Sequence, residues 1–291
     1  MSTHHPTAKP PRRAAYALPT LFTAGNLFLG FLAITKAFQG AMLAASGSLG
    51  HNPHLEASAL MIGAASVLDG LDGRIARMTN TTSDFGRELD SLADVIAFGV
   101  APSILAWIWG FQFLDSSIDP QLRDYIHRFG YFFVFLFVMC GAFRLARFNI
   151  TTNPAPKNPG RPDRKYFVGL PIPAGAAVVA AIVYAADAVP LQWWPLAVAW
   201  TALLGFVSFL MIATWRYRSF KDFNYLNPRS PISLIAMGSV IYVTAIFSQP
   251  VLLLVACTYA GSGVVVRIGG ILKRKLRSAP PPPPREPVLH G

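Results

Sequence analysis

The chain has 291 residues, of which 53% are hydrophobic and only 13% are charged, and its mean hydropathy is +0.42. Soluble domains carry about 25% charged residues, so this composition excludes an ordinary soluble domain and indicates a polytopic membrane protein. The net charge of +11 suits anionic lipid headgroups and nucleotide phosphates. A nucleic-acid partner is not expected, because the sequence contains no basic, aromatic-rich soluble domain.

Apolar stretches of about 20 residues, the length that crosses roughly 30 Å of hydrocarbon, recur along the chain. We predict an all-α membrane bundle with eight spans, at residues 19–37, 57–78, 88–111, 126–148, 171–188, 193–213, 231–248 and 250–272. In this division residues 1–16 are an N-terminal tail and residues 17–275 are the membrane domain. Residues 276–291 contain "APPPPPREP" and are predicted to be a disordered, proline-rich tail.

The distribution of Lys and Arg residues predicts the orientation of these spans. An even number of crossings places both termini on one side of the membrane, and 22 of the 25 Lys and Arg residues lie on that side. The positive-inside rule assigns that side to the cytoplasm. We therefore expect a multi-pass protein of the cell (inner) membrane with both termini cytoplasmic.

Four of the five aspartates in the stretch "VLDGLDGRIARMTNTTSDFGRELDSLADVIAFG", residues 67–99, are regularly spaced. They form two pairs with spacings of three and four residues: Asp69 with Asp72, and Asp90 with Asp94. Each pair therefore shares one face of its own helix, and the turn-prone residues between the pairs allow the two faces to meet. Four converging carboxylates repel one another unless cations neutralise them. Oxygen ligands of this kind suit magnesium, manganese or calcium, whereas zinc usually recruits His or Cys.

Small and basic residues beside the first acidic pair point to a phosphate ligand. Gly70, Gly73 and Ala76 leave room for close approach of a ligand or another helix. Arg77 lies one turn beyond Gly73 and can bind a phosphate with two hydrogen bonds, and Ser83 offers a hydroxyl in the connecting turn. Each feature alone is more often a turn or a packing contact. Their combination at this spacing favours a pyrophosphate site.

The segment from Asp69 to Asp94 reads D-x-x-D-G-x-x-A-R-x8-G-x3-D-x3-D and resembles the signature of the CDP-alcohol phosphatidyltransferases, membrane enzymes with six core helices. The resemblance implies two divalent cations, Mg²⁺ or Mn²⁺, on the cytoplasmic side. Their ligands would be Asp69, Asp72, Asp90 and Asp94. Asp94 would also be the general base. The residues that match CDP-contacting positions are Thr20, Thr23, Gly73, Arg77 and Ser83.

Four further stretches bear on the acceptor alcohol: "LPTLFTAGNLFLGFLAI", "CGAFRLARFN", "YFVGLPIPAGA" and "WRYRSFK". Over most of residues 17–222 they resemble the membrane-type phosphatidylserine synthases of bacteria and archaea. The resemblance implies transfer of a phosphatidyl group from CDP-diacylglycerol to the hydroxyl of L-serine, which yields phosphatidylserine and CMP. It also implies that the chain can form a homodimer.

Two arginines and an asparagine at the cytoplasmic end of the fourth span are candidate ligands for the acceptor or for a phosphate. Arg144 and Arg147 are three residues apart and share a helix face, and Asn149 lies just beyond them. The alternative for the arginines is a role as positive-inside anchors.

Other functions remain open at this point. The same family includes enzymes whose acceptor is glycerol 3-phosphate, inositol phosphate or choline, and choline would need an aromatic cage, for which Phe143 and Phe148 are weak candidates. A divalent-cation transporter is a further alternative, but no acidic relay crosses the predicted spans. A purely structural membrane protein would leave the polar spacing unexplained.

Overall fold

A computed structural model describes residues 13–79, 84–152, 166–218 and 246–276. Its helical elements are α1 (Arg13–Ala45), α2 (Pro53–Thr79), α3 (Asp84–Asp94), the π-helix η1 (Val95–Val100), α4 (Ala101–Gly110), α5 (Pro120–Thr152), α6 (Ile172–Ala185), α7 (Trp194–Ile212) and α9 (Ser248–Leu276). Two short strands, β1 (Tyr166–Val168) and β2 (Arg216–Arg218), pair antiparallel. The predicted helical membrane fold is confirmed, with this small ribbon as an addition.

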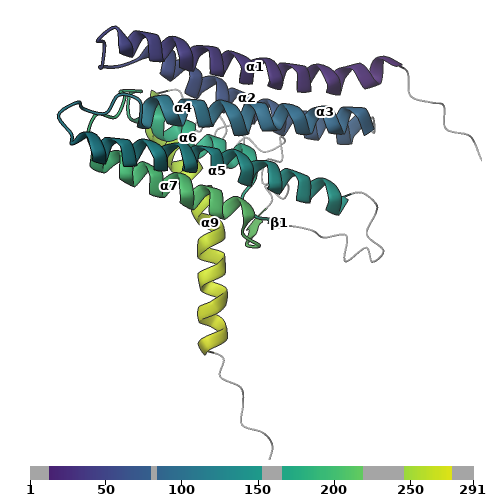
Figure 1. Cartoon of the computed structure of the whole chain (residues 1–291). Helices are drawn as coiled ribbons and strands as arrows, with labels where there is room; N and C mark the ends of the chain where they lie inside the picture. Colours follow the sequence, from purple (N-terminus) through teal and green to yellow (C-terminus); the bar gives the residue numbers. More distant parts are fainter. Residues whose placement is uncertain (1–12, 80–83, 153–165, 219–245, 277–291) are drawn as a thin grey trace, which may run out of the picture.

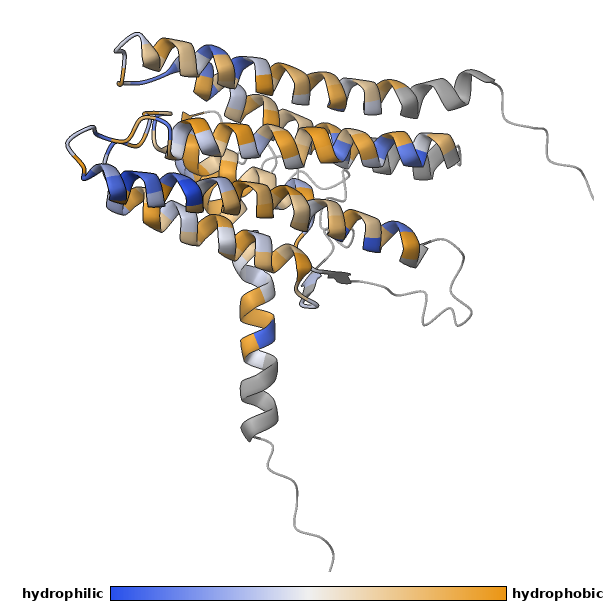
Figure 2. Cartoon of the chain, in the orientation of Figure 1, coloured by the Kyte–Doolittle hydropathy of each residue, from blue (hydrophilic) through white to orange (hydrophobic). Residues whose placement is uncertain are grey.

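The helices from α1 to α7 run side by side, and α3, η1 and α4 continue one another as a single rod (Figure 1). Helix α9 packs on α6 and β2, crosses the bundle steeply, and extends past it at its C-terminal end (Figure 1). Apolar residues predominate along the helices, whereas many hydrophilic residues gather at helix ends and turns (Figure 2). This distribution is the one expected for helices surrounded by lipid.

Within the described residues, five helices are long and apolar enough to cross a membrane: Leu21–Ala45, Phe85–Gly110, Pro120–Ile150, Trp194–Ile212 and Ser248–Gly269. The chain is therefore an integral membrane protein. The predicted number of eight spans is not confirmed. The predicted span 57–78 corresponds to α2, whose polar ends lower its hydropathy. The predicted span 171–188 corresponds to α6, which has 14 residues and covers only about 21 Å. The predicted span 231–248 lies almost entirely outside the described residues.

Small residues bring α1 and α2 into close contact. A Cβ atom at Gly40 would lie 2.5 Å from Leu55, so only glycine fits at this position without a shift. The Asn52 side chain donates a hydrogen bond to the Gly40 carbonyl (2.9 Å), and the Ser58 hydroxyl donates to the Ala33 carbonyl (2.8 Å). Close packing with a few interhelical hydrogen bonds is the usual way in which membrane helices associate.

The rod from Asp84 to Gly110 changes its hydrogen-bonding pattern directly after Asp94. The N–H of Ala101 donates to the carbonyl of Ile96, five residues earlier, as in a π-helix. Pro102 follows at once. Proline has no N–H to donate, and its ring crowds the carbonyl four residues earlier, which disfavours a regular α-helical turn at this point. Short π-segments within α-helices are frequent at functional sites.

Candidate metal and phosphate site

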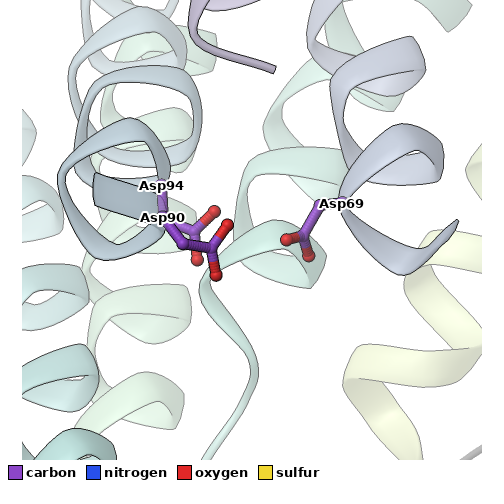
Figure 3. A group of neighbouring side chains, drawn as sticks. All are labelled: Asp69, Asp90 and Asp94. Atoms are coloured by element: carbon purple, nitrogen blue, oxygen red, sulfur yellow. The ribbon is translucent and has the colours of Figure 1, made fainter. Parts of the chain in front are cut away.

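Three acidic side chains converge from two helices. Asp90 and Asp94 lie one turn apart on α3, and both face Asp69 of α2 (Figure 3). Each residue can offer one carboxylate oxygen such that these oxygens lie within 4.8 Å of one another. Asp94 is only 7% exposed, and the other two side chains are partly buried. The convergence arises because residues four apart share a helix face, and the α2 face that carries Asp69 is turned toward that face.

The donor set fits a hard divalent cation. Carboxylates held this close repel one another and are stabilised together when a positive ion lies between them. In the described part of the chain the group contains three aspartates and no histidine or cysteine. Oxygen-only ligands match Mg²⁺ or Mn²⁺ better than zinc.

The structure describes part of the predicted metal and CDP site. Of the predicted CDP contacts, Thr23 is described, and it is buried on α1. The side chains of one predicted metal ligand, Asp72, and of the other four predicted CDP contacts lie outside the part that the structure describes. These four contacts are Thr20, Gly73, Arg77 and Ser83. Their roles stay predictions.

Arg144 of α5 brings a positive charge close to the acidic group. Its side chain is 8% exposed and interacts electrostatically with Asp94 and Asp69, and with the Tyr259 side chain of α9. The Nε atom of Arg144 is buried and has no hydrogen-bond partner within the described residues. A buried guanidinium N–H without a hydrogen-bond acceptor is costly for the fold, so this position is suited to bind an anion.

Arg147 and Asn149 instead make contacts that hold helices together. The Nη1 atom of Arg147 donates to the carbonyl oxygen of Ile212, the last residue of α7, at 3.0 Å. Asn149 donates to the Ser91 hydroxyl of α3 at 2.8 Å. The first contact satisfies a carbonyl at a helix C-terminus, and the second fixes α5 beside the acidic pair. The predicted ligand roles of Arg147 and Asn149 stay predictions.

Two residues near the site were missed in the sequence. Asn26 of α1 donates from Nδ2 to the Asp94 carboxylate at 3.3 Å, and both side chains are buried. Asn26 could have been identified from the sequence, because it is a polar residue on the same helix face as the small residues of the first span. Tyr259 had no signal, because its place near Arg144 depends on how α9 crosses the bundle.

A tyrosine on β2 holds α9 in this place. The Tyr217 hydroxyl donates to the Ala260 carbonyl of α9 at 3.2 Å, and its ring lies against Gly263, where a Cβ atom would come within 2.3 Å of it. Burial raises the pKa of Tyr217 to about 12, so the hydroxyl keeps its proton and remains a donor. The Tyr217 and Tyr259 rings lie 5.9 Å apart between centroids.

Comparison with known proteins identifies the class to which this fold and site belong. The family model for CDP-alcohol phosphatidyltransferase matches residues 16–208. The chain belongs to the CDP-alcohol phosphatidyltransferase family. The matched residues include all three aspartates of the acidic group, whereas α9 lies beyond them.

Three individual relatives within this family share one enzyme name. The chain is 36% identical over 236 residues to the CDP-diacylglycerol–serine O-phosphatidyltransferase of Helicobacter pylori (strain ATCC 700392 / 26695), which covers 80% of this chain and 84% of that protein. It is 33% identical over 195 residues to the enzyme of the same name from Mycobacterium leprae, covering 65% of this chain and 54% of that protein. The relative of the same name from Methanocaldococcus jannaschii is 41% identical over 113 residues, 39% of this chain and 43% of that protein.

Proposed function

We propose that this protein is a CDP-diacylglycerol–serine O-phosphatidyltransferase, which transfers a phosphatidyl group from CDP-diacylglycerol to L-serine and releases CMP. The observation that carries the proposal is the 36% identity, over 80% of the chain, to the Helicobacter pylori enzyme of that name. The convergence of Asp69, Asp90 and Asp94 within this matched family region supports it, because phosphoryl transfer between a nucleotide-activated lipid and an alcohol needs a site for a diphosphate.

The acidic group is the proposed metal site. Asp69, Asp90 and Asp94, together with Asp72, would hold two divalent cations, Mg²⁺ or Mn²⁺. Bound there, the cations would neutralise the diphosphate and stabilise the charge that builds up in the transition state. The CDP group would be bound by residues of α1, α2 and the segment that follows α2: Thr20, Thr23, Gly73, Arg77 and Ser83.

Asp94 is the proposed general base. It takes the proton of the serine hydroxyl as that oxygen attacks the phosphorus that carries the diacylglycerol. A new P–O bond to serine forms, the P–O bond to CMP breaks, and CMP leaves with the electron pair. The hydroxyl has a pKa far above neutrality, so the proton must be removed during attack rather than before it. The burial of Asp94 keeps bulk water away from this step.

Arg144 is the proposed anchor for a negatively charged group of a substrate. Its buried guanidinium lies within electrostatic reach of Asp94, so a serine whose carboxylate binds Arg144 would have its hydroxyl near the base. Arg147 and Asn149 would contribute by fixing the end of α5, through Ile212 and Ser91. CDP-diacylglycerol, L-serine and membrane lipids are thus the proposed partners, and a homodimer stays a prediction.

The proposed location is the cell (inner) membrane with the active site and both termini on the cytoplasmic side. The asymmetric distribution of Lys and Arg residues supports this orientation. CDP-diacylglycerol would then enter the site with its acyl chains in the bilayer and its diphosphate at the acidic group.

The deciding experiment uses the purified full chain in detergent with CDP-diacylglycerol, Mg²⁺ or Mn²⁺, and one alcohol at a time. We expect CMP release and phosphatidylserine formation with L-serine, and none with glycerol 3-phosphate, inositol phosphate or choline. Asp94→Asn should abolish turnover while the protein remains folded in the membrane. Asp115→Asn is the matched control, since Asp115 lies in the connection between α4 and α5 and hydrogen-bonds the backbone N–H of Ser117. Full activity of Asp94→Asn would remove Asp94 from its role.

A further inference from the structure

The buried face of α1 consists of Gly and Ala residues and two polar residues, Thr23 and Asn26. Over residues 21–45, where the side chains of α1 are described, it consists of Thr23, Asn26, Gly30, Ala33, Ala37, Gly40, Ala41 and Ala44. The opposite face carries large exposed apolar residues, such as Phe28 and Phe31. The two polar members, Thr23 and Asn26, lie at the end of α1 that packs beside α3, where Asp94 is found.

Asn26 is tied to Asp94 by a hydrogen bond that the helix packing imposes. Its Nδ2 atom donates to Oδ1 of Asp94 at 3.3 Å, and Asn26 is only 1% exposed. One turn further along both helices, Gly30 lies against Ala97, which sets the distance between the two backbones. The amide must present its NH₂ group to the carboxylate, because a carboxylate can only accept.

The Oδ1 atom of Asn26 shows that helix packing alone does not explain why an asparagine occupies this position. Its Oδ1 atom is buried and has no hydrogen-bond partner within the described residues. An unpaired buried acceptor destabilises the fold, and an apolar side chain of the same size would avoid that loss. Hydrogen bonds between membrane helices also contribute only modestly to stability. The benefit of an asparagine here must therefore lie in what it does to Asp94.

We propose that Asn26 is a positioning residue for Asp94. The hydrogen bond restricts rotation of the Asp94 carboxylate and so presents it to the attacking hydroxyl, and to Asp69 and Asp90, in one orientation. This inference rests on the proposed function, in which Asp94 is the general base. Asn26 itself does not exchange a proton. Its contribution is the orientation of the group that does.

The competing explanation is that Asn26 simply holds two helices together, and Ser58 provides the matched control for it. Ser58 is fully buried, and its hydroxyl donates to the Ala33 carbonyl at 2.8 Å, so it ties α1 to α2 by a hydrogen bond of comparable burial. Ser58 is not part of the acidic group. A purely structural role of Asn26 would make Asn26→Ala and Ser58→Ala behave alike.

The experiment compares Asn26→Ala, Asn26→Leu and Ser58→Ala in the full chain purified in detergent. Asn26→Leu keeps most of the side-chain volume, so it separates the loss of the hydrogen bond from the creation of a cavity. We expect both Asn26 variants to lower kcat by about 10- to 100-fold while KM for serine and for CDP-diacylglycerol stays within about twofold. Ser58→Ala should keep kcat. The melting temperatures of Asn26→Leu and Ser58→Ala should be similar.

A second readout does not depend on turnover. Binding of Mn²⁺ alone, followed by its electron paramagnetic resonance signal, should be several-fold weaker in Asn26→Leu than in Ser58→Ala. Wild-type kcat in Asn26→Leu, or an equal loss of kcat in Ser58→Ala, would overturn the inference. If the wild-type protein forms no phosphatidylserine, the proposed function fails instead. The Mn²⁺ comparison then still tests whether Asn26 orients Asp94: equal affinities would overturn that orientation.

Discussion

A Cβ atom at Gly30 would lie 2.8 Å from the Cα atom of Ala97, so the backbones of α1 and η1 touch at this point. A leucine at position 30 must push the two helices apart and separate Asn26 from Asp94, one turn away. We expect Gly30→Leu to lower activity on the order of 100-fold, because small displacements of reacting groups have effects of this size. Phosphatidylserine formation by the purified protein measures the loss.

The control for this variant is Gly63→Leu on α2, since a Cβ atom at Gly63 would meet no atom within 4 Å. It introduces the same side chain into a membrane helix without a collision. Near-wild-type activity is expected for Gly63→Leu. Equal losses in the two variants would show that the contact between Gly30 and Ala97 is not the cause.

Metal removal should abolish activity, and the aspartates should determine how easily the metal returns. We expect a chelator to inactivate the enzyme, and Mg²⁺ or Mn²⁺ to restore it. In Asp69→Ala and Asp90→Ala the Mn²⁺ affinity should fall by at least about 10-fold, because a ligand is lost from a small oxygen-only group. Titration with Mn²⁺ checks this. Asp124→Ala removes an exposed carboxylate of α5 that pairs with Arg128, and it should bind Mn²⁺ normally.

Arg144 and Arg147 are one turn apart, yet their replacement by alanine should have different effects. Arg144→Ala removes the buried guanidinium near Asp94, so KM for serine should rise by at least about 10-fold. Arg147→Ala removes the hydrogen bond to the Ile212 carbonyl, so stability should fall by about 1 kcal/mol while KM changes little. Kinetics and thermal unfolding separate the two effects. A rise in KM for serine in Arg147→Ala, with only a loss of stability in Arg144→Ala, would assign serine binding to Arg147 and the structural role to Arg144.

Helix α9 should matter for activity although it lies beyond the family-matched residues 16–208. In Gly263→Leu the new side chain collides with the Tyr217 ring, which must release α9 and move Tyr259 relative to Arg144. We expect a several-fold loss of activity and a lower melting temperature. Gly261→Leu, two residues away, meets no atom within 4 Å and should resemble the wild type in both measurements.

The sequence predicted what depends on local spacing and missed what depends on distant parts of the chain. The approach of Asp69 to the pair on α3 could be anticipated, because spacings of three and four residues place carboxylates on one helix face. The contact of Arg147 could not, because the α7 carbonyl that it binds comes 65 residues later. The sequence places Asn26 in line with the small residues of its span, but its partner Asp94 lies 68 residues later and could not be predicted from that alignment.

The length of α6 was also overestimated by the prediction from sequence. The apolar stretch that starts near residue 171 continues to 188, and the predicted span followed it. Helix α6 ends at Ala185, because Asp187 and Ala188 adopt positive φ angles of 51°. Hydropathy does not report such a reversal of the backbone, since an alanine is as apolar in a turn as in a helix.

The π-segment between Asp94 and Pro102 is where the rod from Asp84 to Gly110 departs from a regular α-helix. An imino acid has no hydrogen to donate, so the regular winding of the rod from Asp84 to Gly110 is interrupted shortly before it. The interruption divides the rod into an apolar anchor that is seated among its neighbours and a short charged arm that carries Asp90 and Asp94. The break in regular winding thus lies between the buried anchor and the acidic arm. A hydrogen bond to the fifth rather than the fourth preceding residue shifts the helical register, so Asp90 and Asp94 lie on a different face relative to the anchor from the one that regular α-helical spacing would give.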